Sequence, residues 1–211
     1  MLQTLLSSLW SGKSVTRGLL DFRLAQETLR GSVIDIGGGT NPAYISFMNR
    51  ESGIKIQSFD VKVGATTDFE TDVLPASTDQ FDTVLFLNVM EHIFNHQHLA
   101  GEVVRIVKPG GQLIGFVPFL MWYHPDHKDF FRYTHEALEI IFTKAGGQNI
   151  EIEPIAYGPF TAAAHLMVLS LPKTIRVPLY LPLFALDWVF LKLRPGQGDK
   201  FALGYFFTMT K

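Results

Sequence analysis

Apolar runs that end in glycine or polar residues alternate along the chain with segments in which apolar residues recur at helical spacing. The run Val33–Ile36 has the length of a strand buried on both faces, and Gly37–Gly39 ends it abruptly. From Leu99 to Val107 the apolar residues follow a helical period, and the segment Lys108–Gly111 stops that helix. The same patterns predict strands over residues 33–36, 54–59, 83–87, 112–118, 150–155 and 201–209, and helices over 99–107 and 134–145.

This alternation predicts the fold class α/β. Strands joined through helices form right-handed crossovers and a mainly parallel sheet that is covered on both faces. A chain of 211 residues fits one domain of ordinary size. We expect a single domain over residues 1–211, with N-terminal helices over 1–30, a core over 31–155, an apolar helical insertion over 156–200 and a last strand over 201–211.

The insertion is the least ordinary part of the chain. The stretch Pro154–Pro172 lacks Asp, Glu, Lys and Arg, but its prolines, a glycine and His165 make it a poor membrane span. Val177–Leu193 is also apolar, yet Asp187 lies within it and Lys192 near its end, so we expect an interfacial or buried helix. Three roles stay open: a helical pair packed over the sheet, a lid that shapes an apolar acceptor pocket, and a contact with a membrane surface or a second copy in a homodimer.

Composition excludes several classes of site and partner. The chain has no cysteine, which excludes disulfides, thiol nucleophiles and Cys-ligated metal centres and fits a cytoplasmic location. Residues 1–10 carry no basic side chain and make a poor secretory signal. The net charge of −2 provides no positive field to attract a polyanion, so we expect no nucleic-acid partner.

The glycine run lies where open α/β sheets bind their ligands, at the carboxyl ends of the strands near a reversal of strand order. Gly37–Gly39 let a ligand approach the backbone closely, and Asp35 lies at the same end of the strand. A helix is expected to begin near Pro42 and to offer N–H groups to an anion. Asp60 follows Asp35 by 25 residues, at the end of the next strand, where an acid accepts hydrogen bonds from a ribose diol.

Four segments occur in an order and at spacings that are typical of one superfamily. They are VIDIGGGTNP at residues 33–42, DVLP at 72–75, FDTVLFLNVMEHI at 81–93 and RIVKPGG at 105–111. Together they resemble the class I S-adenosylmethionine-dependent methyltransferases of the small-molecule type, over roughly residues 30–150. The resemblance implies a Rossmann-like, mostly parallel sheet of seven strands with helices on both faces, and S-adenosylmethionine as the cofactor.

The resemblance also implies which residues contact the methionine, ribose and adenine parts of the cofactor. For one of them, Asp72, a role as a turn residue stays open beside the ligand contact. The implied set is Asp35, Gly37 and Gly39 for the methionine portion, Asp60 for the ribose, Asp72 for the adenine amino group, Val73 for the adenine ring, and Asn88, through its backbone, for the wall near the methionine.

The residues after Asn88 bear on the acceptor. Methyltransferases that act on the amino group of adenine often carry Pro-Pro and an aromatic residue there, which clamps a flipped base. This chain has Val89, Met90 and Glu91 instead. Together with the negative net charge, this difference favours an oxygen or carbon atom of a small molecule as the acceptor.

A second cluster of titratable side chains, at residues 124–134, follows the strand expected at 112–118. Methyl transfer requires an aligned acceptor, and an acceptor hydroxyl must also lose its proton. His124 or His127 could serve as the catalytic base, because an imidazole titrates near neutral pH.

Arg132 in the same loop has two interpretations. It could hold an anionic group of the substrate by a bidentate contact, or pair with Asp126 or Asp129 to fix the loop. The loop and the apolar insertion together resemble methyltransferase-like proteins often found with glycan or polysaccharide biosynthesis. That second resemblance suggests a glycan-like or lipid-linked acceptor.

No metal ion is expected from either group of histidines. His124, Asp126 and His127 are so close in sequence that their side chains diverge. In the segment 91–98, His92 lies at the start of a helix and the other two histidines are expected to face solvent.

Two other functions compete with methyl transfer. A nicotinamide-dependent oxidoreductase would also use Gly37–Gly39 and Asp60, but Pro42 stands where the third glycine of the dinucleotide motif belongs. A non-catalytic cofactor-binding protein could use the apolar insertion to dock on a membrane or on a biosynthetic complex.

Overall fold

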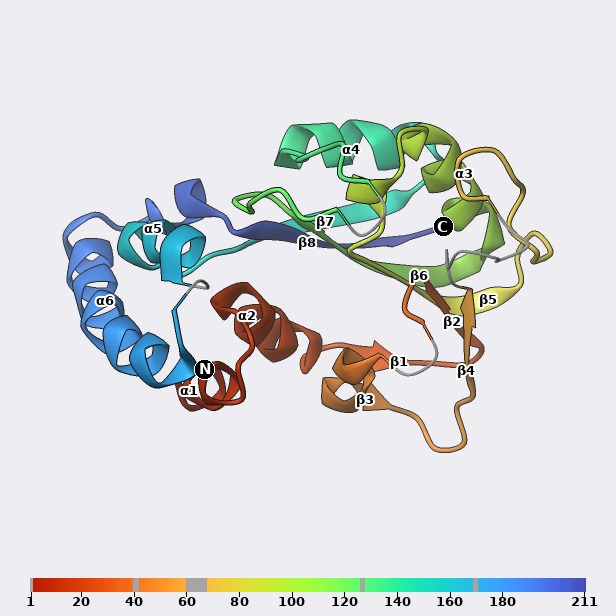
Figure 1. Ribbon diagram of the computed structural model, residues 1–211. Helices are drawn as coiled ribbons and strands as arrows, with labels where there is room; N and C mark the ends of the chain where they lie inside the picture. The colour runs from red at the N-terminus through yellow and green to blue at the C-terminus, as the bar shows by residue number, and fades with distance from the viewer. Residues whose placement is uncertain (1, 40–41, 60–67, 126–127, 169–170) are drawn as a thin grey trace.

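Six strands form one mixed sheet in the computed structural model, which describes residues 2–39, 42–59, 68–125, 128–168 and 171–211. β8 runs antiparallel to both of its neighbours, and the other pairs are parallel. Across the sheet the strands lie in the order β4 (Ile56–Phe59), β2 (Val33–Ile36), β5 (Phe81–Leu87), β6 (Val107–Pro118), β8 (Gly204–Thr210) and β7 (Gln148–Ile155) (Figure 1). The predicted fold class α/β is confirmed.

The expectation of seven strands is wrong by one. Six strands form this sheet in the part of the chain that the structure describes, and the described residues between β4 and β5, 68–80, form turns and irregular structure. There the backbone N–H of Asp72 donates to the carbonyl of Asp68 at 2.8 Å, and the Asp72 carboxylate accepts from the N–H of Asp68 at 2.7 Å. These local bonds take backbone groups that a strand ladder would need.

Several boundaries also differ from the sequence predictions. The helix expected near Pro42 is a five-residue 3-10 turn, η1 (Ala43–Phe47), too short to offer a row of N–H groups, and residues 40–41 before it lie outside the described residues. The last strand starts at Gly204, and η3 (Gly198–Phe201) lies before it. The helix expected over 134–145 is present, and Thr134 caps it: Thr134 Oγ1 accepts from the N–H of Ala137.

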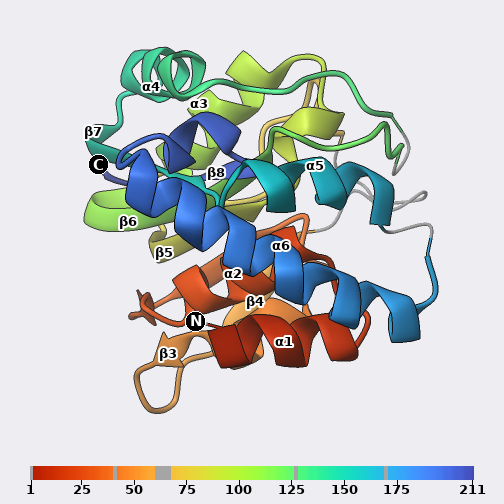
Figure 2. The same ribbon diagram turned by 90° about the vertical axis from the view of Figure 1, so that its left-hand side faces the viewer.

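Helices cover both faces of the sheet (Figure 1). On one face lie α3 (His96–Ile106) and α4 (His135–Lys144). On the other lie α1 (Leu2–Trp10), α2 (Val15–Leu24), α5 (Pro159–Val168) and α6 (Lys173–Leu193), and α6 runs along the outside of this layer against α1 and α5 (Figure 2). Three short elements complete the described structure: β1 (Thr28–Leu29), β3 (Asn49–Arg50) and η2 (Met90–His92).

The order of the strands defines where a ligand can bind. β2 lies between β4, which follows it in sequence, and β5, so the chain reverses its direction of winding at β2. In open α/β sheets the ligand crevice lies outside the carboxyl ends of the strands at this point. Here those ends are Ile36, which leads into the glycine run, and Leu87, which leads into η2.

Candidate active site

The glycine turn after β2 packs so closely against the end of β5 that it excludes side chains. Gly37 and Gly39 have φ angles of +80° and +68°, a conformation that glycine adopts without strain. A Cβ on Gly37 would collide with the Val89 side chain. The N–H of Gly37 donates to the carbonyl of Phe59 at 2.6 Å, which ties the turn to β4.

Asp35 lies buried beneath this turn. The hydroxyl of Tyr44 donates to Asp35 Oδ2 at 2.6 Å, and burial together with the Asp35 charge raises the pKa of Tyr44. A Cβ on Gly38 would collide with the Asp35 carboxylate. Asp35 and Gly39 also line a pocket of about 250 Å³. The Asp35 carboxylate therefore leaves no room for a side chain at position 38.

Of the other residues implied for the cofactor, three lie within the described residues and one does not. Asn88 follows β5 in the left-handed conformation, with φ +55°, and its N–H donates to the carbonyl of Phe116 at 2.9 Å. Asp72 acts as a turn residue, and the side chain of Val73 is 65% exposed beside it. Asp60 lies outside the described residues, so its ribose contact stays a prediction.

Glu91 is a buried carboxylic acid at the end of β5. Its side chain has no exposed surface, and neither carboxylate oxygen has a hydrogen-bond partner among the described residues. Burial raises the pKa of Glu91 to about 8. An unpaired carboxyl group in such a place is costly to the fold, which makes it a candidate for function.

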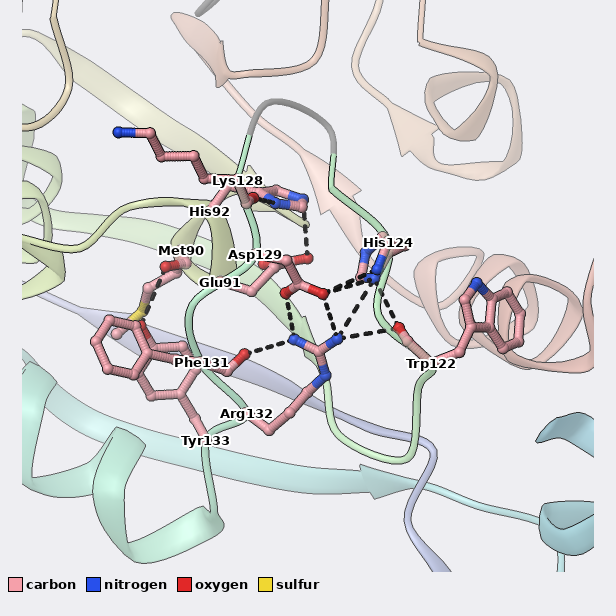
Figure 3. A network of polar contacts seen from close by, with 10 residues as sticks. All are labelled: Met90, Glu91, His92, Trp122, His124, Lys128, Asp129, Phe131, Arg132 and Tyr133. Atoms are coloured by element: carbon pink, nitrogen blue, oxygen red, sulfur yellow. Dashed lines mark hydrogen bonds and ion pairs between the residues drawn. The ribbon is translucent and has the colours of Figure 1, made fainter.

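Two histidines lie next to Glu91. His92 Nε2 lies 3.7 Å from Glu91 Oε1. His124, in the loop after β6, packs edge-on against His92 with 5.3 Å between ring centroids (Figure 3). The structure therefore brings together residues that lie more than thirty positions apart in the sequence. The other catalytic base predicted from the sequence, His127, lies outside the described residues.

Arg132 fixes the loop that carries His124. Its guanidinium forms a bidentate pair with Asp129, with Nη2 2.7 Å from Oδ2, and also donates to the carbonyl of Trp122 (Figure 3). This pairing holds the pKa of Asp129 well below its usual range. Asp129 in turn accepts from the N–H of His124 at 2.9 Å. Of the two interpretations of Arg132, the geometry favours loop fixing, and the anion contact stays a prediction.

Comparison with known proteins assigns the family. A model of the methyltransferase domain matches residues 13–151, which is well over half of the chain. The chain belongs to this methyltransferase family. No curated protein matches it in sequence. S-adenosylmethionine is the cofactor that membership implies.

Solved structures share the fold, and several of them are named as methyltransferases. The [4+2]-cyclase SpnF superposes with a TM-score of 0.58 at 17% identity, covering 93% of this chain and 81% of that one. A phosphoethanolamine N-methyltransferase 2 from Haemonchus contortus, solved with S-adenosyl-L-methionine, has a TM-score of 0.55 at 15% identity and covers 93% of this chain, which spans 52% of that enzyme's length. A SAM-dependent methyltransferase from Archaeoglobus fulgidus has a TM-score of 0.52 at 14% identity, covering 92% and 94%.

The described residues of this methyltransferase fit the implied cofactor. The glycine turn lies at the reversal of strand order, and a Cβ at Gly37 or Gly38 would collide with the Val89 or Asp35 side chain that packs against it. Asn88, in its left-handed conformation, borders the same crevice from β5. This is the arrangement expected of a surface that holds a nucleoside ligand against backbone atoms.

Sequence reasoning gave no role to Glu91 or Asp129. Glu91 and His92 were visible only as part of a family motif, and Asp129 only as one of two partners for Arg132. The sequence did contain one signal for a shared site: a Glu-His pair follows β5 and a histidine follows β6. Neighbouring parallel strands place both segments at one edge of the sheet.

Proposed function

We propose that the protein is an S-adenosylmethionine-dependent methyltransferase that acts on an oxygen or carbon atom of a small, glycan-like or lipid-linked acceptor. The observation that carries this proposal is the family match together with the side-chain-free turn at Gly37, which lies at the reversal of strand order. When bound, S-adenosylmethionine supplies a methyl group activated by a sulfonium. The chain itself binds and aligns the two reactants, which is the main demand of an in-line transfer.

The acceptor side of the crevice is the loop that follows β6. His124 Nδ1 lies 3.2 Å from the carbonyl of Trp122, which can only accept, so we assign the ring proton to Nδ1. Nε2 then keeps its lone pair, and His124 acts on an acceptor hydroxyl through this nitrogen. The ion pair of Arg132 with Asp129 holds the histidine in place.

The cofactor assignment is tested with two alanine variants that share one backbone strain. Gly37 and Gly53 both have φ +80°, but a Cβ on Gly53 meets nothing within 4 Å. The positive φ costs each variant about 1–2 kcal/mol of unfolding free energy. Gly37→Ala costs more than this, because its Cβ would also collide with the Val89 side chain. We expect Gly37→Ala to weaken the binding of S-adenosylhomocysteine at least tenfold in isothermal titration, and Gly53→Ala to bind like wild type. Unchanged affinity in Gly37→Ala would refute the placement of the cofactor.

The reaction is tested separately from binding. Protein incubated with methyl-labelled S-adenosylmethionine and fractionated cell extract is expected to transfer label to one fraction. Retained cofactor affinity with no transfer would favour the non-catalytic alternative, and SpnF, named as a cyclase, illustrates that this fold serves other chemistry. Thermal stabilisation by NAD instead of S-adenosylhomocysteine would favour the oxidoreductase.

We further propose that α6 holds the protein against the surface of a lipid bilayer, as a lipid-linked acceptor would require. Thr174–Leu193 is a helix of 20 residues that is long and apolar enough to cross a membrane, and only 17% of its most apolar window is buried. It buries a narrow stripe, Tyr180, Phe184 and Asp187, beside which Val177 and Leu183 are partly buried, and most of its other side chains are exposed. Exposed Lys192, which lies 3.9 Å over the ring of Trp188, suits an anionic headgroup region.

Asp187 favours a helix that lies on the membrane over one that spans it. Its carboxylate accepts from the N–H groups of Phe160 and Thr161 at 2.9 and 2.8 Å, at the start of α5. If α6 left the protein to cross a bilayer, the buried Asp187 charge would enter hydrocarbon. The N–H groups at the start of α5 would also lose their hydrogen-bond acceptor. The structure therefore supports an interfacial position.

A further inference from the structure

Glu91, His92 and His124 form a cluster, here called the Glu91 cluster, whose donor atoms converge. One carboxylate oxygen and one ring nitrogen of each histidine all lie within 4.8 Å of one another. In a tetrahedral site with metal–nitrogen distances of about 2.0–2.1 Å, neighbouring donor atoms lie about 3.3 Å apart. Small side-chain rotations close the difference. The cluster combines two elements of the fold, η2 and the loop after β6 (Figure 3).

The histidine rings are held as metal-binding histidines are. His92 Nδ1 lies 2.6 Å from the carbonyl of Lys128, and His124 Nδ1 lies 3.2 Å from the carbonyl of Trp122. Since a carbonyl oxygen only accepts, these contacts favour the proton on Nδ1 and a lone pair on Nε2 in both rings; at His124 the carbonyl is closer than the Arg132 Nη2 donor, at 3.5 Å. A backbone carbonyl that orients the second nitrogen of a ligating imidazole is the usual outer partner in metal sites.

The third donor is a carboxylate with no other use in the described structure. Glu91 is fully buried, and both of its oxygens lack a hydrogen-bond partner among the described residues. The Arg132 guanidinium donates through Nη1 and Nη2 to Asp129 and to the carbonyls of Phe131 and Trp122, and it forms no hydrogen bond with Glu91. A divalent cation would supply the positive charge that stabilises this carboxylate.

We propose that Glu91, His92 and His124 bind a divalent transition-metal ion of the zinc class. Two imidazole nitrogens and one carboxylate suit Zn²⁺, Mn²⁺, Fe²⁺ or Co²⁺, whereas Mg²⁺ prefers oxygen ligands and water. Three protein ligands leave at least one coordination position for a water molecule or a substrate oxygen.

The use of this ion in catalysis rests on the proposed methyltransferase function. An acceptor hydroxyl bound at the open position loses its proton to solvent more readily, because the cation stabilises the resulting oxyanion. With the ion bound, the Nε2 lone pair of His124 would be a ligand, so this role would replace the direct action of His124 on the hydroxyl. Metal binding itself does not depend on that role, so the two can fail independently.

The test is equilibrium dialysis of the full chain against Zn²⁺, Mn²⁺ and Mg²⁺ separately, with the bound metal measured by mass spectrometry. We expect about one equivalent of Zn²⁺ in wild type and a loss of at least tenfold in affinity in His124→Ala and in Glu91→Gln. His135→Ala is the matched control, because His135 is exposed at the start of α4, and it is expected to bind like wild type.

A second readout separates lost ligands from lost folding. Wild type with Co²⁺ is expected to show the visible absorption of a low-coordinate site, absent in His124→Ala. Circular dichroism in the presence of EDTA is expected to show all variants folded. Should wild type bind no Zn²⁺, or a folded His124→Ala bind it as wild type does, the metal site is excluded. Cofactor titration in EDTA reports on the proposed function separately.

Discussion

His165 shows how one buried side chain joins the N-terminal helices to the insertion. It lies on α5 with no exposed surface, and its Nε2 is 3.2 Å from the hydroxyl of Thr16 on α2. Its ring also packs 5.1 Å from that of Trp122. Burial lowers the pKa of His165 from 6.5 to about 4, so the ring stays neutral in the folded protein at neutral pH.

The depressed pKa of His165 predicts a loss of stability in acid. An unfolded chain takes up a proton at this residue near pH 6.5, and the folded chain only near pH 4. Between these pH values proton binding therefore stabilises the unfolded state relative to the folded state. The stabilisation is complete above pH 6.5 and falls by up to about 3 kcal/mol as the pH drops towards 4. Urea unfolding at several pH values is expected to show a shallower fall in His165→Gln than in wild type. His135→Gln, at an exposed site, serves as the control, and equal slopes in all three proteins would contradict the prediction.

Local chemistry was predictable from the sequence and long-range burial was not. Thr134 was identifiable as a cap because the bond it accepts comes from three residues away, at Ala137. Glu91 could not be identified as a buried acid, because what covers it is a loop far along the chain, where the N–H of Phe130 donates to the Glu91 carbonyl. Burial of a side chain by residues distant in sequence depends on the tertiary fold.

At the scale of elements, the start of α5 depends on a side chain from α6. Asp187 accepts from two N–H groups in the first turn of α5, and Gly158 lies so close that a Cβ there would come within 2.5 Å of the carboxylate. The carboxylate satisfies two of the backbone donors that every helix leaves open at its N-terminus. The two helices of the insertion therefore form one unit.

This cap predicts the effect of Asp187→Ala. Removal of the carboxylate is expected to lower the unfolding free energy by about 1–2 kcal/mol, the usual cost of a lost helix cap. The measurement is chemical denaturation, with Asp199→Ala as a control because Asp199 is an exposed acid nearby in sequence. A loss no larger than that of the control would indicate that α5 and α6 are held together without this contact.

The helices and strands could be predicted from the sequence where the apolar pattern was strong. The predictions failed where side chains take the hydrogen bonds that a strand would need. β2 and β5 were predicted because their apolar runs are continuous, as burial on both faces requires. The expected seventh strand came from the family resemblance alone. Between β4 and β5, the acids at residues 68–72 form a turn. The helix expected over residues 177–193 is confirmed as α6, which begins earlier than expected, at Lys173, and continues through Pro178 and Pro182.

At the scale of the whole molecule, the two faces of the sheet differ in what they leave exposed. The face of α3 and α4 is closed by one apolar cluster, with isolated exposed residues such as Ile140. On the outside of the other face, α6 lies against α1 (Figure 2). Within the described part of the chain, these two helices expose eight large apolar side chains: Trp10, Ile175, Leu179, Leu181, Leu186, Trp188, Val189 and Leu193. Exposed apolar side chains gathered on two neighbouring helices indicate a partner.

The lipid surface proposed as that partner predicts binding to vesicles. Wild type is expected to sediment with vesicles of phosphatidylcholine and phosphatidylglycerol, and the fluorescence of Trp188, 57% exposed in the protein alone, to shift to the blue. Leu181→Asp combined with Val189→Asp is expected to reduce binding at least tenfold, because each charge would enter the interface. Ile140→Asp is the matched control, since Ile140 is equally exposed on the opposite face, and it is expected to bind like wild type. If wild type stays in solution with vesicles and forms a dimer that the double variant abolishes, the apolar surface joins two copies of the chain instead.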